Sequence, residues 1–261
     1  MRLHHLPGFL KHYLTSGNEH SVHSPFVFDL LTKCIYAKKS HTGFLRIEAL
    51  REKLIHDTHK IKTVDLGAGS AFDKKPVERT IRDVVRRFAK SPRYCRLLYR
   101  LTEYLKPGVM IELGTSLGIS AMYQAAGNNK GTLYSIEGCT ETAEIARNNI
   151  REAGYANVEV RTGNFDDALP VLLHELPTVS YAFIDGNHTH EATMRYFKLL
   201  SAKVNDDSLL VFDDINWSHG MKRAWDEIKS DDRVTIAINL YFLGIVFFNT
   251  SFSKQDFRLR Y

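Results

Sequence analysis

Apolar and polar residues follow two alternating patterns from Val109 onward. Short, nearly continuous apolar runs predict buried strands, and between them apolar residues recur at helical spacing. The expected strands are 109–113, 131–136, 157–162, 180–184 and 207–212, and the expected helices lie near 118–126, 140–153, 166–175, 189–202 and 218–230. Alternation of this kind favours a parallel sheet with helices on both faces.

The end of the chain has a different pattern. Two β-rich runs, Val234–Asn239 and Phe242–Phe248, leave no room for a helix between them. We therefore expect a hairpin, which makes one strand antiparallel to the rest. The predicted fold class is α/β, with a Rossmann-like, seven-stranded mixed sheet whose last strand is antiparallel. A plain dinucleotide-binding fold does not end in this way.

Residues 1–108 are predicted to be mainly helical. Ser24-Pro25 and Ser91-Pro92 each have the pattern of an N-cap followed by proline at the first helical position. Helices are expected at Phe26–Tyr36, Gly43–His59 and Ile81–Phe88, and an amphipathic stripe from Tyr94 to Leu105 predicts one more. We expect two parts, a basic helical N-terminal extension or cap over 1–108 and the α/β domain over 109–261.

A glycine turn follows the first strand of the predicted α/β domain. The apolar run ends at Gly114-Thr-Ser-Leu-Gly118, after which a helix begins. Glycine lets the backbone approach a ligand where a Cβ would collide, and a helix N-terminus offers unpaired N–H groups. About 20 residues further on, the next strand ends in Glu137, whose carboxylate can accept both hydroxyls of a ribose. The pattern predicts a nucleotide-type cofactor site.

Glu112, Gly114, Gly118 and Glu137 give this stretch a resemblance to the class I S-adenosylmethionine-dependent methyltransferases, over roughly Val109 to Asn249. The stretch is most similar to the small-molecule O-methyltransferases of the catechol and caffeoyl-CoA kind, which share the sequence motif Glu-Leu-Gly-Thr-x-x-Gly-x-Ser. The resemblance implies that S-adenosyl-L-methionine is the cofactor. It implies these cofactor-binding residues: Glu112, Gly114, Thr115, Ser116, Gly118, Ser120, Glu137, Gly138, Asn164, Phe165 and Asp185.

Asn164 and Phe165 are the residues that the resemblance places against the adenine. The family more often has Asp where Asn164 stands. The alternative role for Asn164 is to cap the helix that follows it.

A second glycine-rich stretch, Asp65-Leu-Gly67-Ala-Gly69-Ser70, also matches a generic methyltransferase first motif. Pro76 would break the expected helix start, and no strand ending in an acidic residue follows at the right distance. We therefore interpret 65–70 as a loop.

Carboxylates follow two of the later predicted strands. Asp185 ends one strand, and Asp213 and Asp214 end the next. Side chains at these carboxyl ends meet at the edge of the sheet where ligands bind. Grouped carboxylates repel one another unless a proton or cation lies among them, and Mg²⁺ takes oxygen ligands of this kind. By resemblance to the catechol-type enzymes, Asp185, Asp213 and Asp214 would bind Mg²⁺ or another divalent cation, with Asp214 standing where the family has Asn.

The catechol-type lysine near the fourth strand has no counterpart here, and His188 or His190 lies in its place. Two mechanisms stay open. A metal could lower the pKa of the acceptor hydroxyl, or His188 could act as general base with Asp185 orienting it. The structural alternative is that Asp185 and Asp214 only cap the helices that follow them.

Composition limits the class of protein and its partners. Of 261 residues, 44% are hydrophobic and 25% are charged, as in ordinary globular proteins. Residues 1–108 carry a net charge of +11, and residues 109–261 carry −6. This asymmetry suggests an acidic partner or substrate, and the alternative is that the basic helices are only a solvated surface. Three scattered cysteines and the lack of a signal-peptide or membrane-spanning pattern predict a cytoplasmic protein.

These features together predict a cytoplasmic S-adenosylmethionine-dependent O-methyltransferase acting on a small-molecule acceptor. The alternatives are an RNA methyltransferase that uses the basic helices, a non-catalytic cofactor-binding protein and a nicotinamide dehydrogenase. The last lacks its usual Gly-x-Gly-x-x-Gly, and no recognition motif supports nucleic acid. The sequence leaves open the acceptor, the metal and a homodimer.

Overall fold

The computed structural model describes residues 6–38, 41–64 and 76–261. The chain divides into two compact units. Unit 1 combines Met1–Tyr36 with Pro177–Tyr261, and unit 2 is Ala37–Leu176. These limits do not coincide with the expected boundary between 108 and 109, which stays a prediction. The loop expected at 65–70 lies outside the described residues.

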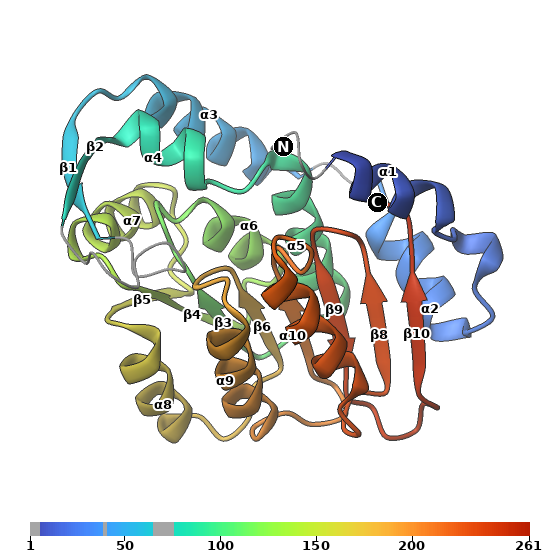
Figure 1. The fold of residues 1–261 in the computed structure, drawn as a ribbon. Coiled ribbons are helices and arrows are strands. Elements are labelled where there is room, and N and C mark those ends of the chain that lie inside the picture. Colours follow the sequence, from blue (N-terminus) through green and yellow to red (C-terminus); the bar gives the residue numbers. More distant parts are fainter. Residues whose placement is uncertain (1–5, 39–40, 65–75) are drawn as a thin grey trace. The chain divides into compact units, whose positions relative to one another are not determined.

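Unit 2 contains the first half of the α/β alternation (Figure 1). Its strands β3 (Val109–Leu113), β4 (Thr132–Glu137) and β5 (Val158–Thr162) pair in that order and are parallel. All but the first residue of β3 are buried, whereas β5 is partly exposed. The nearly continuous apolar run of β3, interrupted by Glu112, fits a strand covered on both faces.

The helices of unit 2 include every one that the sequence predicts there. They are α3 (Thr42–His56), α4 (Ile81–Phe88), α5 (Pro92–Leu105), α6 (Ile119–Gly127), α7 (Thr140–Glu152) and α8 (Phe165–Glu175). Pro92 stands at the first turn of α5, and left-handed Lys106 (φ 50°) ends that helix. A separate antiparallel pair, β1 (Lys60–Thr63) with β2 (Val77–Thr80), was not predicted.

Unit 1 contains the second half of the alternation. Its strands are β6 (Tyr181–Ile184), β7 (Leu209–Phe212), β8 (Ile236–Asn239), β9 (Gly244–Phe247) and β10 (Gln255–Arg258), in the order β10-β8-β9-β7-β6. β9 is antiparallel to both β7 and β8, so the predicted hairpin is confirmed. β10 lies parallel to β8 and adds a strand to the seven predicted ones, so the last strand of the chain is not the antiparallel one.

The helices of unit 1 are α1 (Leu6–Thr15), α2 (Pro25–Leu30), the short 3₁₀ turn η2 (Glu19–Ser21), the π-helical η3 (Leu31–Ile35), α9 (His190–Ser201) and α10 (His219–Ser230). The Ser24 hydroxyl accepts a hydrogen bond from the Val27 N–H, which confirms the N-cap before Pro25. In α1, His12 is buried and its Nε2 lies 3.1 Å from the Leu259 carbonyl oxygen. No helix among the described residues is long and apolar enough to cross a membrane.

The mixed α/β fold that the sequence predicts is thus confirmed. β6 and β7 are buried along their whole length, and their carboxyl ends carry Asp185 and Asp213. In unit 2, the carboxyl ends of β3 and β4 carry the glycine turn and Glu137. Each unit therefore presents one set of the expected site residues.

Candidate functional site

Glu112 lies in β3 and is completely buried among hydrogen-bond donors of unit 2. The Ser135 hydroxyl donates to Oε2 at 2.5 Å, and Gln124 Nε2 donates to Oε1 at 2.6 Å. Burial raises the pKa of this carboxyl to about 7, against the opposing effect of these donors and of Ser120. Glu112 is held by the protein itself and links β3, β4 and α6.

The glycine turn between β3 and α6 has a left-handed backbone at three positions. Gly114 has φ 104°, Ser116 has φ 48° and Gly118 has φ 86°. The φ of Gly118 favours glycine, and a Cβ there would also lie 3.1 Å from the Ile150 side chain, which would have to shift slightly. The turn leads directly into the N-terminus of α6, at Ile119.

Glu137 faces the glycine turn from the end of β4. Its Oε2 accepts the Ser116 N–H at 2.8 Å, and its Oε1 accepts the Cys139 N–H at 3.0 Å. Burial raises the pKa of this carboxyl, and bonds from backbone N–H groups, including that of Gly138, oppose the rise. A carboxylate has about four acceptor positions and three backbone N–H groups bond to this one, so one position stays open for a ligand hydroxyl.

The other predicted cofactor residues of unit 2 lie around these two acids. The Thr115 hydroxyl is 2.6 Å from that of Ser135, and Ser120 is buried in α6. Asn164 is the N-cap of α8, and its side chain accepts the Asp166 N–H at 3.3 Å, which confirms its capping role. Phe165 is half-buried at the start of that helix. The adenine contact of Asn164 and Phe165 stays a prediction.

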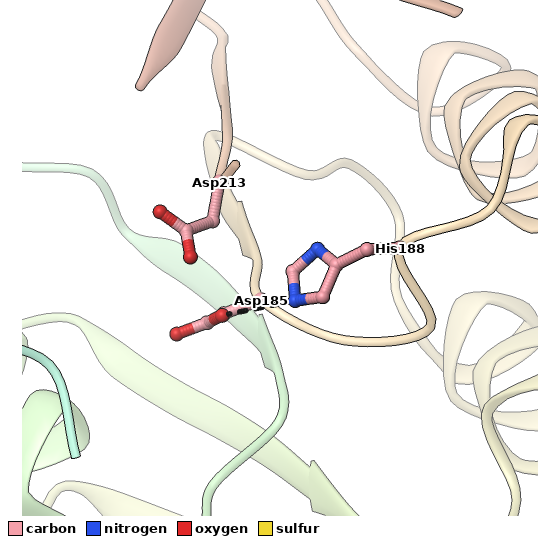
Figure 2. A group of neighbouring side chains, drawn as sticks. All are labelled: Asp185, His188 and Asp213. Carbon is pink, nitrogen blue, oxygen red and sulfur yellow. Dashed lines mark ion pairs between the residues drawn. The ribbon is translucent and has the colours of Figure 1, made fainter. Parts of the chain in front are cut away.

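Unit 1 brings three of the predicted acceptor-side residues together (Figure 2). One ligand atom from each of Asp185, His188 and Asp213 lies within 4.8 Å of the others. His188 Nε2 is 3.6 Å from Asp185 Oδ1, and Asp213 is only 2% exposed. The backbone joins the two strand ends, because the Asp213 N–H donates to the Ile184 carbonyl oxygen at 2.9 Å.

His188 reaches this group because the loop after β6 turns sharply at Asn187, a left-handed residue with φ 51°. Asn is among the residues that adopt this conformation most readily. His190 begins α9 instead, where its Nε2 lies 2.9 Å from Glu227 Oε1. Of the two histidines that the sequence offered, His188 is the one beside Asp185.

Asp214 does not belong to this group among the described residues. It is left-handed, with φ 51°, and its carbonyl oxygen accepts the Trp217 N–H at 2.8 Å. The helices that follow the two strands are capped by Thr189 and Ser218. Asp185 and Asp214 are therefore not the caps of α9 and α10. The alternative prediction, that these two residues only cap the helices that follow them, is wrong.

Some of the residues that bond to Glu112 and Glu137 were not predicted from the sequence, namely Gln124, Ser135 and Cys139. Gln124 and Ser135 are polar residues within apolar stretches, on the buried sides of α6 and β4. A polar side chain in such a position needs a buried partner, so this signal was present in the sequence. Cys139, which donates its N–H to Glu137, gave no such signal.

Residues 111–215 match the family model described as a methyltransferase domain, which confirms the resemblance seen in the sequence. The O-methyltransferase imqG of Aspergillus flavus is 27% identical over 148 residues, which are 49% of this chain and 60% of that protein. The chain thus spans less than two thirds of the length of this curated relative.

Solved structures of O-methyltransferases share the fold. The enzyme of Bacillus cereus in complex with S-adenosylhomocysteine has a TM-score of 0.57 at 19% identity, over 81% of this chain and 93% of that one. TomG of Streptomyces achromogenes, in complex with S-adenosylmethionine, has a TM-score of 0.55 at 19% identity, over 86% and 95%. The Rossmann-like methyltransferase fold is therefore confirmed.

Proposed function

We propose that this protein is an S-adenosylmethionine-dependent methyltransferase that methylates a hydroxyl oxygen of a small molecule. The observation that carries the proposal is the pairing of Glu137 with the left-handed turn at Gly114–Gly118 through the Ser116 N–H. This arrangement offers a carboxylate to a ribose beside a turn that a cofactor can approach closely. The match of residues 111–215 to a methyltransferase domain supports the same cofactor.

The residues of unit 2 fit the cofactor by their own chemistry. Gly114, Thr115, Ser116, Gly118 and Ser120 would line its amino-acid part, and Glu137 and Gly138 its ribose, as the resemblance implies. When bound, S-adenosylmethionine supplies a methyl group on a sulfonium, which is transferred by in-line displacement. The protein's own contribution is to hold the acceptor oxygen in line with the methyl–sulfur bond, so that the two reactants meet in the reactive orientation.

The acceptor end of the reaction is assigned to Asp185 and His188. His188 would take the proton from the acceptor hydroxyl, and Asp185 would orient the imidazole from 3.6 Å, a distance that must shorten for a hydrogen bond. The same two side chains and Asp213 also fit a divalent cation, because two carboxylates and an imidazole suit such an ion. A bound cation would lower the pKa of the acceptor hydroxyl.

The acceptor itself is proposed to be acidic, since residues 1–108 carry a net charge of +11. The three cysteines are free and buried, in keeping with the proposal that the protein works in the reducing cytoplasm.

Methyl transfer from radiolabelled S-adenosylmethionine tests the proposal. A panel of catechols, other phenols, hydroxy acids and phosphorylated alcohols should contain at least one acceptor, and amines and thiols are assayed beside it. Each compound is assayed with Mg²⁺, with Mn²⁺ and with a chelator. If methyl transfer depends on added metal, the mechanism with a bound cation is favoured over the mechanism in which His188 is the general base. Tight cofactor binding without transfer to any hydroxyl, amine or thiol acceptor would contradict the assigned activity and favour a non-catalytic binding protein.

A further inference from the structure

Strand β1 contacts the N-terminal end of α7, although it pairs with β2 and not with β3, β4 or β5. The Lys62 N–H donates to Glu141 Oε2 at 2.7 Å. The Lys62 carbonyl oxygen accepts a hydrogen bond from the Cys139 thiol at 3.3 Å. Both backbone polar groups of this one residue are therefore bonded to the stretch that follows β4.

Cys139 connects this contact to the acid of the proposed cofactor site. Its side chain bonds to Lys62, and its backbone N–H bonds to Glu137 Oε1 at 3.0 Å. The other oxygen of Glu137 accepts the Ser116 N–H at 2.8 Å. A continuous series of hydrogen bonds thus runs from β1 through Cys139 and Glu137 to the glycine turn.

Glu141 is the residue best placed to keep β1 there. It stands in the first turn of α7, where its negative charge is favourable at the helix N-terminus. Its carboxylate accepts a backbone N–H of a strand that pairs with one other strand, β2, within the described part of the chain. Without Glu141, that N–H would return to water, and the hydrogen bond from the Cys139 thiol would still join Lys62 to this stretch.

We propose that strand β1 is a positioning element of the cofactor site, held by Glu141, that fixes Cys139 and through it the carboxylate of Glu137. The inference rests on the proposed function, because it assigns Glu137 to the ribose of S-adenosylmethionine. It extends the site to the stretch before residue 109, since residues 60–63 then contribute to cofactor affinity. Glu141 and Lys62 act through Glu137 and do not touch the cofactor themselves.

The test is calorimetric titration of S-adenosylhomocysteine into the full chain and three variants. Glu141→Ala removes the acceptor of the Lys62 N–H and should weaken binding about 2- to 10-fold, as for the loss of one hydrogen bond. Glu141→Gln keeps an oxygen acceptor without the charge and should bind within about 2-fold of wild type. Glu144→Ala, an exposed acid one turn further along α7, is the matched control and should bind like wild type.

Cys139→Ser and Cys139→Ala give a second, independent pair. Serine keeps a donor for the Lys62 carbonyl oxygen and alanine does not, so only Cys139→Ala should weaken binding. Thermal denaturation of all variants separates this role from general stability, which alone would lower the melting temperature and leave the affinity of the folded protein unchanged.

Two results would overturn the inference. One is unchanged affinity in Glu141→Ala while wild type binds, and the other is equal weakening in Glu141→Gln and Glu141→Ala, which would assign the effect to charge. A wild-type protein that does not bind S-adenosylhomocysteine would instead contradict the proposed function, and this inference with it.

Discussion

Replacement of Glu112 by glutamine should change the stability of the protein in a pH-dependent way. The carboxyl group is completely buried, and burial raises its pKa from 4.5 to about 7. Because the folded-state pKa lies above the unfolded value, the folded protein binds the extra proton between these two pH values. Stability from this group is therefore fully present below about pH 4.5 and falls as the pH rises toward about 7.

The magnitude follows from the shift. Each unit of pKa difference corresponds to about 1.4 kcal/mol, so the ionised carboxylate costs roughly 3 kcal/mol above pH 7. Glutamine has nearly the same shape and carries no charge at any pH. Its oxygen can accept from Gln124, and its amide can donate to the Ser135 hydroxyl, which can reverse its role.

Urea denaturation of wild type and Glu112→Gln at several pH values between 5 and 8 measures the effect. The free energy of unfolding of the variant minus that of wild type should rise by about 2–3 kcal/mol from pH 5 to pH 8. Glu144→Gln, at an exposed position, should show a difference that does not change with pH. A flat difference for Glu112→Gln as well would refute the claim that burial dominates the pKa of Glu112.

Three further changes test other parts of the structure. Gly244→Ala should lower stability by about 1–3 kcal/mol in thermal denaturation, because the new Cβ would lie 2.7 Å from Cε3 of the buried Trp225 ring. Unchanged stability would show that the ring can move. Asn216→Ala should lower the free energy of unfolding by about 1 kcal/mol in the same measurement, since it removes the 2.6 Å hydrogen bond from Nδ2 to the carbonyl oxygen of left-handed Tyr241. An unchanged free energy of unfolding would mean that water replaces the amide. His188→Ala should reduce methyl transfer at least about 100-fold with unchanged affinity for S-adenosylhomocysteine, and full activity would remove this histidine from the reaction.

The sequence predicts the α/β alternation well because its strands are short apolar runs and its helices have clear apolar faces. β3, β6 and β7 are buried almost throughout, so their composition alone identifies them. β1, β2 and β10 were missed for the opposite reason. They are partly exposed and carry charged residues, so none of them forms an apolar run.

The sequence predicts which residues belong to the candidate site better than it predicts which of them lie close together in the fold. Strand ends supply Glu137, Asp185 and Asp213, and strand ends can be located from the pattern. That His188 joins Asp185 and Asp213 while Asp214 does not depends on the left-handed conformation of Asn187 and Asp214 themselves. Such local backbone choices are set by the folded surroundings and leave no periodic signal.

The most direct test of the account is calorimetric titration of S-adenosylhomocysteine into wild type, Gly114→Val and Gly67→Val. Gly114 has φ 104°, which a β-branched residue adopts only with strain, so valine there should abolish binding. Gly67 belongs to the second glycine-rich stretch, and Gly67→Val should bind like wild type. Loss of binding in Gly67→Val with binding kept in Gly114→Val, or no binding to wild type, would contradict the assignment of the cofactor to the turn between β3 and α6.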